Sequence, residues 1–437
     1  MYMLKIIDIR DNGDNGLLEK LLSRSQLDRA DVLGTVNDII GNIRKNGDEA
    51  LLEYTRRFDG ADMDAGSLRV TPGEFEQAYE RVDAELVGVV RRARAKIEAF
   101  HAKQKENSWF SAEEDGVILG QLYRPLETVG IYVPGGTAVL TSSVLMNALP
   151  AKVAGVKRII MATPPSKDGS INPAVLVAAR EAGVDEVYKM GGAQAVAAMA
   201  FGTRTVPRVD KIFGPGNIYV ATAKRMVYGF CDIDMFAGPS EITVVADDTA
   251  DPAFVAADLL SQAEHDALSA AILVTVSESM AARVCEEIQK QFSSLSRKGI
   301  LEKSLGDYGA AVIARDMDQA LEVVNAIAPE HLELCVEEPF SLLGSVKNAG
   351  AVFLGNWSSE PLGDYFAGPN HVLPTGGTAR FFSPLNVADF IKKSSVISYT
   401  RKALEKVKDD IMLFARSEGL DGHANAISVR FGGERGE

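Results

Sequence analysis

The chain has 437 residues, of which 46% are hydrophobic and 24% are charged, a composition typical of a globular protein with about two to four domains. Its formal net charge of -14 excludes the clustered positive charge that nucleic-acid binding needs, and it does nothing to favour an anionic membrane. No run of about 18 apolar residues occurs, and the segment MYMLKIIDIRDNGDNG breaks into charged and turn residues before a signal-peptide core can form. Three scattered cysteines fit a reducing compartment. We therefore expect a cytoplasmic protein without membrane or nucleic-acid partners.

Residues 17 to about 107 predict a helical region, because apolar residues recur there at three- and four-residue spacing. His101 lies in a charged part of this region, and we expect it to be exposed to solvent. The alternating segment GVILGQLYRPL then predicts a hairpin or an edge strand.

From Thr128 onward, short β-rich runs alternate with helices, as is typical of parallel sheets covered on both faces. A first set of strands is TVGIYV, KRIIMA, DEVYKM and DKIF, and a second set is EITVVAD, AAILVTV, AAVIA, HLELCV and AVFLG. Two doubly wound α/β units in tandem are the simplest fold. Near Pro384 a helix-rich tail begins, with KKSSVISYT as a short strand or linker.

Four glycine-rich loops follow strand-like runs: PGGT (134–137), GGAQ (191–194), GPGN (214–217) and AGPSE (237–241). Ligands of open α/β sheets bind beyond the carboxyl ends of the strands, and glycine lets the backbone approach a ligand closely. Turn formation alone would explain any one loop, but four in succession favour a nucleotide-sized ligand. The GxGxxG motif is absent, so a nicotinamide cofactor would be held differently from the standard dinucleotide fingerprint.

The stretch SQAEHD places Gln262 and His265 three residues apart near the end of a predicted helix. Residues at this spacing share a helix face, so both side chains could bind one metal ion, and nitrogen and oxygen ligands suit zinc. The pair is weak evidence alone, because a lone helical histidine is more often a surface or core residue.

Three further stretches carry polar groups suited to catalysis. APEHLEL sets Glu330 beside His331 at the start of a strand, where a carboxylate can activate water and an imidazole can act as a general base. A plain turn before a strand is the alternative. The other two stretches, GDYFAGPNHVLPTGGTAR and SEGLDGHANA, hold Asp364, His371, Glu418 and His423.

Asp364 and His423 would complete a four-ligand zinc site with the SQAEHD pair. The residues alone do not select these four ligands from the other polar candidates.

These motifs resemble those of the bacterial histidinol dehydrogenases from about residue 30 onward. The segments that carry the resemblance are, in order, PLETVGIYVPGGTAVLTSSVLMNALPAKVAGV, MGGAQAVAAMAFGT, GPGNIYVATAK, IDMFAGPSEITVVAD, ADLLSQAEHD, APEHLEL, GDYFAGPNHVLPTGGTARF and EGLDGHANA. Gly422 departs from the alanine frequent in that family, and it touches none of the implied ligands.

The resemblance implies a zinc- and NAD-dependent enzyme that oxidises L-histidinol through L-histidinaldehyde to L-histidine with two NAD molecules, the last steps of histidine biosynthesis. His331 would take the alcohol proton, and Glu330 would activate the water that attacks the aldehyde. One zinc ion per subunit would be bound by Gln262, His265, Asp364 and His423. The implied substrate-binding residues are Ser240, Gln262, His265, Glu330, His331, Asp364, His371, Glu418 and His423, and the implied NAD-binding residues are Tyr132, Gln194 and Asn217.

The implied fold is two tandem, incomplete Rossmann-like, doubly wound domains with small helical N- and C-terminal parts. We expect an N-terminal arm (1–29), a first domain with most metal and catalytic residues (30–127 plus 241–384), a second, NAD-binding domain (128–240) and a C-terminal helical tail (385–437). The resemblance also implies a homodimer in which the tail is swapped, so that Glu418 and His423 serve the partner's active site.

Three other functions fit parts of the pattern. A related dehydrogenase could oxidise another polar alcohol, such as a sulfonated diol, but His371, Glu418 and His423 favour histidinol. A zinc hydrolase would use Glu330 to activate water, and NADH formation would distinguish it from a dehydrogenase. A non-catalytic binding protein is disfavoured by the complete set of acid, base and metal-ligand candidates.

Overall fold

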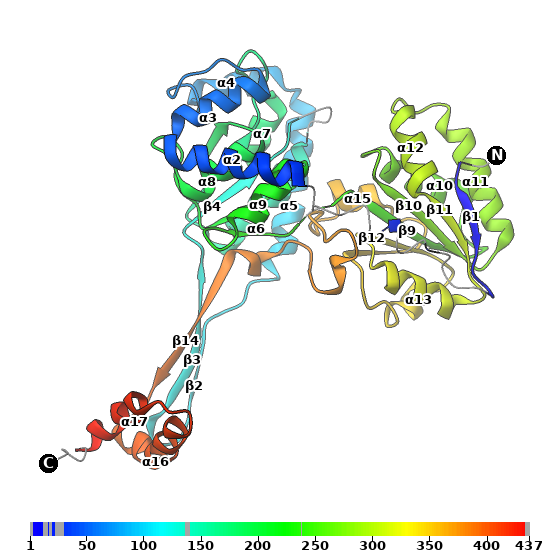
Figure 1. Ribbon diagram of the computed structural model, residues 1–437. Helices are drawn as coiled ribbons and strands as arrows, with labels where there is room; N and C mark the ends of the chain where they lie inside the picture. Colours follow the sequence, from blue (N-terminus) through cyan, green and yellow to red (C-terminus); the bar gives the residue numbers. More distant parts are fainter. Residues whose placement is uncertain are drawn as a thin grey trace. The chain divides into compact units, whose positions relative to one another are not determined.

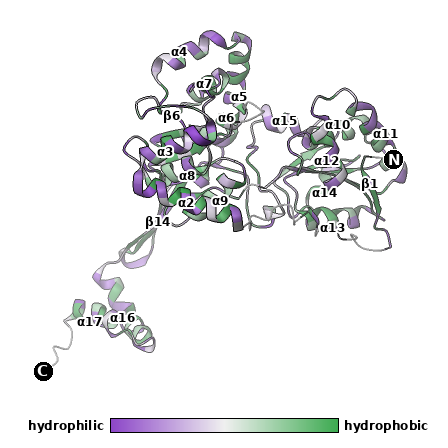
Figure 2. Ribbon diagram, turned by 45° about the horizontal axis from the view of Figure 1, so that its top comes forward, coloured by the Kyte–Doolittle hydropathy of each residue, from purple (hydrophilic) through white to green (hydrophobic). Residues whose placement is uncertain are grey.

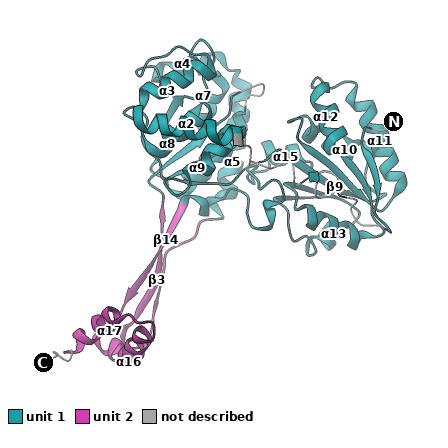
Figure 3. Cartoon of the chain, viewed as in Figure 1, with its two compact units in different colours: residues 1–104, 126–390 teal, residues 105–125, 391–437 magenta. Residues whose placement is uncertain are grey.

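The computed structural model describes residues 3–11, 16, 20–21, 30–135, 140–236 and 238–432. The chain forms two compact units, which we call the first unit (within 1–104 and 126–390) and the second unit (within 105–125 and 391–437; Figure 3). No helix in the described ranges is both long enough and apolar enough to cross a membrane.

The first unit contains a six-stranded parallel sheet with strand order β1-β11-β10-β9-β12-β13 (Figure 1). Its strands are β1 (Lys5–Asp8), β9 (Glu241–Ala246), β10 (Ala270–Thr275), β11 (Ala310–Ile313), β12 (His331–Cys335) and β13 (Ala351–Leu354). The central strands are apolar at almost every position because both of their faces are buried. Neighbouring residues of β9 face opposite cores: Val244 packs on one side of the sheet, and Val245 packs on the other.

Helices cover both faces of this sheet. One core includes residues of α10 (Pro252–Ala263), α11 (Glu278–Phe292) and α12 (Lys298–Tyr308), and the opposite core includes residues of α13 (Met317–Ile327). Figure 2 shows the hydrophilic and hydrophobic sides of α11, whose buried residues include Met280, Val284 and Ile288. This spacing places one apolar stripe against the sheet.

A second, five-stranded parallel sheet of the first unit has strand order β6-β5-β4-β7-β8. Its strands are β4 (Thr128–Tyr132), β5 (Arg158–Thr163), β6 (Glu186–Lys189), β7 (Lys211–Phe213) and β8 (Asp232–Ile233). They alternate with α6 (Thr141–Ala154), α7 (Pro173–Glu181), α8 (Gly192–Phe201) and α9 (Ile218–Val227). The two doubly wound α/β parts expected from the sequence are therefore confirmed, as is every strand of the two expected sets.

The N-terminal helices pack against the helices that flank the five-stranded sheet. The N-terminal helices are α2 (Ala30–Asn46), α3 (Asp48–Tyr54), α4 (Pro72–Arg81) and α5 (Ala84–Ala102). Val36 and Ile43 of α2 share a core with Val196 of α8, while α4 and α5 contact α7 and α6, respectively. This packing differs from the expected grouping of 30–127 with 241–384, because helical periodicity reveals an apolar stripe without revealing which sheet covers it.

The expected N-terminal arm contributes the edge strand β1 to the six-stranded sheet. This strand pairs in parallel with β11. Most of the rest of that arm, residues 12–15, 17–19 and 22–29, lies outside the described residues.

The second unit contains an antiparallel sheet of order β14-β3-β2, formed by β2 (Trp109–Ala112), β3 (Ile118–Pro125) and β14 (Ile391–Ser398). A hairpin or an edge strand was expected at GVILGQLYRPL: the segment forms the central strand β3, which makes a hairpin with the preceding β2. KKSSVISYT contributes the strand β14. Two helices follow, α16 (Arg401–Ser417) and α17 (Asp421–Ser428). Asp115, in the turn between β2 and β3, forms ion pairs with Lys402 and Lys406 of α16.

His101 is 0% exposed, so the expectation of a solvent-exposed side chain was wrong. The charged helix α5 has a buried stripe at four-residue spacing, and Ala93, Ile97 and His101 all belong to it. The His101 Nδ1 lies 2.7 Å from Gln104 Oε1, and its Nε2 lies 3.4 Å from Asn370 Nδ2. These contacts tie α5 to the segment that precedes His371.

A buried ion pair fixes the GPGN loop that follows β7. Lys224 on α9 pairs with Asp234 after β8, and their side chains are 3% and 1% exposed. Lys224 Nζ donates to the Gly214 carbonyl oxygen at 2.9 Å, and Asp234 Oδ2 accepts the Gly214 N–H at 2.7 Å. Gly214 has a φ of +107°, and an added Cβ would lie 2.1 Å from the Tyr132 carbonyl oxygen, so this position requires glycine.

Replacing His101 with glutamine is expected to reduce the loss of stability at acidic pH. Burial lowers the pKa of His101, so as the pH falls below about 6.5 the unfolded chain binds the proton before the folded protein does, and folding becomes less favourable. The free energy of unfolding falls by up to about 1.4 kcal/mol for each pH unit below about 6.5. Thermal unfolding at pH 7.5 and pH 5 should show a smaller decrease in Tm for His101→Gln than for the wild type; equal decreases would contradict the prediction.

The Lys224→Met variant is expected to lose about 3–5 kcal/mol of stability, because the substitution leaves the buried Asp234 carboxylate without its counter-ion. Lys224→Met combined with Asp234→Asn should regain part of the loss, since no unpaired charge is then buried. Lys290→Met is the matched control: it removes the lysine that pairs with Glu287, a lysine whose side chain is 66% exposed, and the expected change is about 0–1 kcal/mol. Urea unfolding measures all three, and equal losses for the single and double variants would refute the explanation.

Candidate functional site

The catalytic candidates lie at the amino-terminal edge of the six-stranded sheet. β9 begins at Glu241 and β12 begins at His331, and the two strands pair so that His331 is opposite Ile242. Parallel pairing therefore brings the starts of both strands to the same edge. Ligands of open α/β sheets usually bind at the opposite, carboxyl edge.

His331 is held as a neutral imidazole with one nitrogen available. It is 4% exposed, and burial lowers its pKa to about 3, so it is uncharged at pH 7. Its Nδ1 lies 3.1 Å from the Glu241 carbonyl oxygen and donates to it, which leaves the lone pair on Nε2. Nε2 has no hydrogen-bond partner within the described part of the chain and lies 3.9 Å from Asp364 Oδ1. It can therefore accept a proton.

Glu330 lies beside His331 and contacts the same strand. Its Oε2 accepts the Glu241 N–H at 2.9 Å and lies 3.7 Å from His331 Nδ1. Burial, together with nearby carboxylates that include Glu241, raises the pKa of Glu330 well above its usual value. A carboxyl group with a raised pKa can take up and release a proton near neutral pH.

His265, Glu360 and Asp364 form a cluster suited to a metal ion, because one potential ligand atom from each lies within 4.8 Å of the others. Glu360 and Asp364 are four residues apart on the short helix α15 (Glu360–Tyr365) and so project from one side of it. α10 ends at Ala263, so His265 lies in the turn after the helix and not on it. The sequence analysis missed Glu360, although its spacing from Asp364 was a signal.

Gln262 supports a ligand at this place. The residue is 0% exposed, and neither its Oε1 nor its Nε2 has a hydrogen-bond partner among the described residues. A buried amide without partners costs about 1–3 kcal/mol, and coordination of a cation by Oε1 would compensate part of that cost. The residues present therefore fit a divalent metal ion.

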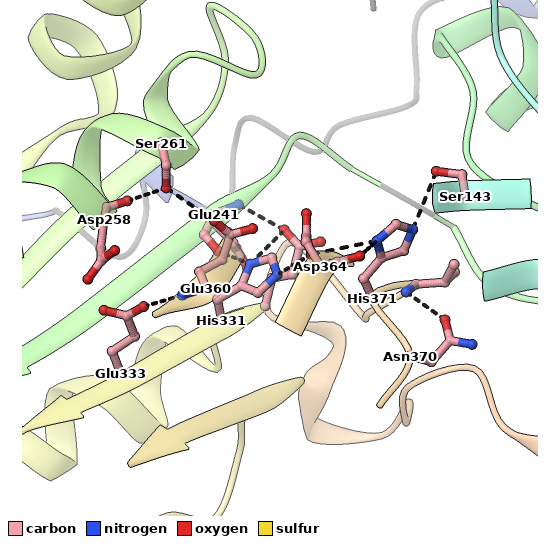
Figure 4. A network of polar contacts seen from close by, with 12 residues as sticks. Ser143, Glu241, Asp258, Ser261, His331, Glu333, Glu360, Asp364, Asn370 and His371 are labelled. Atoms are coloured by element: carbon pink, nitrogen blue, oxygen red, sulfur yellow. Dashed lines mark hydrogen bonds and ion pairs between the residues drawn. The ribbon is translucent and has the colours of Figure 1, made fainter. Parts of the chain in front are cut away.

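Further carboxyl groups lie in this region (Figure 4). Burial, followed by the adjacent Asp364, raises the pKa of Glu360 to about 8, and burial raises the pKa of Asp364 to about 6. Glu333 is 1% exposed and accepts the Glu360 N–H at 2.7 Å, and burial also raises its pKa, with Asp258 adding to the effect. Charge neutralisation by a cation would stabilise the ionised forms.

His371 adds a second neutral imidazole. Its Nδ1 donates to the Asp364 carbonyl oxygen at 3.1 Å, and its Nε2 lies 3.4 Å from Ser143 Oγ (Figure 4). Burial lowers the pKa of His371 to about 4. Ser143 of α6 was not among the predicted site residues. Ser240, which was predicted, directly precedes β9 and accepts the Ala270 N–H at 3.0 Å through its carbonyl oxygen.

The predicted NAD-binding residues lie at the carboxyl edge of the five-stranded sheet. Tyr132 ends β4, Gln194 lies in the first turn of α8, and Asn217 caps α9 by accepting the Tyr219 N–H at 3.0 Å. The Tyr132 hydroxyl accepts the Gly192 N–H at 3.1 Å, so two of the glycine-rich loops meet at the end of β4. Residues 136–137 of the PGGT loop and residue 237 of the AGPSE loop lie outside the described residues.

Glu418 and His423 belong to the second unit. Glu418 is the C-cap of α16, and His423 lies on α17, with both residues exposed.

Comparisons with known proteins show the family of this chain. A family model described as "Histidinol dehydrogenase" matches residues 22–431. A histidinol dehydrogenase of Heliobacterium mobile is 58% identical over 412 residues, covering 94% of this chain and 96% of the relative. One of Bacillus subtilis is 56% identical over 396 residues, covering 91% of this chain and 92% of the relative.

A solved structure shows the same fold. The crystal structure of a histidinol dehydrogenase from Elizabethkingia anophelis superposes with a TM-score of 0.92 at 40% sequence identity, covering 99% of this chain and 98% of that one. With the family model spanning most of the chain and the relatives matching nearly end to end, the chain belongs to the histidinol dehydrogenase family and is an oxidoreductase.

Proposed function

We propose that the protein oxidises L-histidinol through L-histidinaldehyde to L-histidine, with two molecules of NAD as oxidant and one zinc ion per subunit. Membership of the histidinol dehydrogenase family supports the substrate. The observation that carries the proposal is the buried pair of Glu330 and His331, because an acid and a base held side by side suit consecutive oxidations in one site.

His331 acts in both oxidation steps. Its free Nε2 takes the hydroxyl proton while the carbinol carbon gives its hydride to the nicotinamide of NAD, and histidinol becomes the aldehyde. While water adds to the aldehyde, the same nitrogen returns this first proton to the carbonyl oxygen. It then takes a hydroxyl proton from the resulting diol while a second NAD accepts a hydride. The product is the carboxylic acid, which loses its proton to solvent and becomes the carboxylate of histidine.

Glu330 acts between the two oxidations. Its carboxylate takes a proton from the water that attacks the aldehyde carbon, and the raised pKa suits this transfer near neutral pH. His371 and Ser240 are proposed to bind the substrate.

Zinc would be held by Gln262, His265 and Asp364, with His423 as the fourth ligand. It would orient the imidazole and amine of the substrate by binding their nitrogen atoms. The unpaired amide of Gln262 and the cluster of His265 with Asp364 support this assignment. We further propose a cytoplasmic homodimer in which the tail, 385–437, is swapped and supplies His423 and Glu418 to the partner's site.

The proposed NAD site lies within 128–240, where Tyr132, Gln194 and Asn217 follow strands of one parallel sheet. Their loops have the position at which open α/β sheets bind nucleotides.

The stoichiometry of the reaction tests the function. We expect two NADH to form per L-histidinol consumed, with one zinc per subunit in the same sample. Removal of the metal by a chelator should abolish turnover until zinc is restored.

An amino alcohol without an imidazole is the matched control and should give no NADH. Hydrolytic activity without NADH would favour a zinc hydrolase, and turnover of the control alone would favour a dehydrogenase of another polar alcohol.

Glu330→Gln is expected to affect one half-reaction, whereas His331→Asn is expected to affect both. His331→Asn should slow oxidation of histidinol by about 10²–10⁴-fold, because the alcohol then has no proton acceptor. Glu330→Gln should spare that step relative to the formation of histidine from added histidinaldehyde. Rapid-mixing measurements of NADH with each substrate separate the two steps, and an equal loss in both steps for Glu330→Gln would refute this division.

A further inference from the structure

We propose that Asp59 binds the hydroxyl groups of a ribose in the dinucleotide and makes the site selective for NAD over NADP. This inference rests on the proposed function, since it names a further binding residue of the same cofactor site. In the sequence, Asp59 lies far from the glycine-rich loops and outside the motifs described above.

Asp59 contacts the loop that follows β6. Its Oδ2 lies 3.5 Å from Gln194 Nε2, and a Cβ built on Gly191 would lie 2.9 Å from its Oδ1. The carboxylate therefore lies against the backbone of Gly191. The neighbouring residue, Gly192, donates its N–H to the Tyr132 hydroxyl at 3.1 Å. Asp59 thus belongs to the same small group as two of the proposed NAD-binding residues.

The position of Asp59 is fixed by its own segment. It ends a π-helical turn, Thr55–Asp59, and the following Gly60 has a left-handed φ of 74° that turns the chain away. Such π-turns are frequent at functional sites. The preceding helix α3 is anchored by Ala50 and Leu51, which share a core with Tyr132 and α8.

The carboxylate has no counter-ion among the described residues, whereas Asp62, three residues later, pairs with Arg56 at 2.6 Å. Gln194 is 1% exposed, and its Oε1 is without a hydrogen-bond partner in the described part of the chain. A ligand with several hydroxyl groups can donate hydrogen bonds both to the half-buried carboxylate and to the buried amide oxygen beside it. Burial raises the pKa of Asp59 to about 6, and a hydrogen bond from the backbone of Gly191 opposes this rise.

The ligand chemistry follows from these groups. The two oxygens of a carboxylate can each accept a hydrogen bond, so they match the neighbouring hydroxyls of a ribose. A phosphate on the 2′-oxygen would remove one of these donors and place negative charge next to Asp59. Repulsion between like charges then disfavours NADP.

The test compares Asp59→Asn with Asp62→Asn, the matched control on the same segment. Hydrogen bonds to charged groups contribute about 1.5–3 kcal/mol, so Asp59→Asn should raise the KM and Kd for NAD by about tenfold or more. The preference for NAD over NADP should fall by at least a similar factor, while the KM for histidinol changes by less than about twofold. Asp62→Asn should leave all of these values unchanged.

Several outcomes would overturn the inference. A folded Asp59→Asn variant with unchanged affinities for NAD and NADP would do so, as would equal changes in the KM for NAD and for histidinol, which indicate a general structural effect. Asp59→Ser is the second variant if the first unfolds, and affinities are compared per folded molecule by titration of intrinsic fluorescence. If the wild type itself neither binds NAD nor reduces it with histidinol, the proposed function fails; if it does both and Asp59 has no effect, only this inference fails.

Discussion

The cluster of buried carboxyl groups at the amino edge of the six-stranded sheet is the constraint on which the site depends. Glu333, Glu360 and Asp364 are largely removed from water, and each has a raised pKa because of burial or of a neighbouring carboxylate. Isolated buried carboxylates are costly. The neighbouring His265 and the unpaired amide of Gln262 complete a set of ligands for a cation. The architecture therefore concentrates charge where a metal ion would restore the balance.

The two ends of the strands serve different chemistry. The glycine-rich loops follow strands of the five-stranded sheet, as expected for a nucleotide site, and the Lys224–Asp234 pair fixes one of them through both backbone groups of Gly214. The acid–base pair instead begins a strand of the other sheet. A search of the carboxyl edges alone would not have found the proposed acid–base pair.

Much of this could be predicted from the sequence. Apolar runs such as EITVVA and AAILVT predict buried parallel strands, and Tyr132, Gln194 and Asn217 follow predicted strands. Glu330 and His331 are adjacent in the chain, so their proximity needs no tertiary information. The four-residue spacing of Glu360 from Asp364 was a signal, but it places the two side chains on one side only because α15 is helical. The sequence could not predict the burial of His101 or which sheet the N-terminal helices cover, since both depend on packing between distant segments.

Glu241 has a role that its own side chain does not reveal. Its N–H is accepted by Glu330, and its carbonyl oxygen accepts from His331. The proposed acid and base are thus both attached to the main chain of a single residue. The N–H and the C=O of Glu241 are held in place by β9, so the strand positions both side chains at once. A displacement of β9 would therefore move the proposed acid and base together.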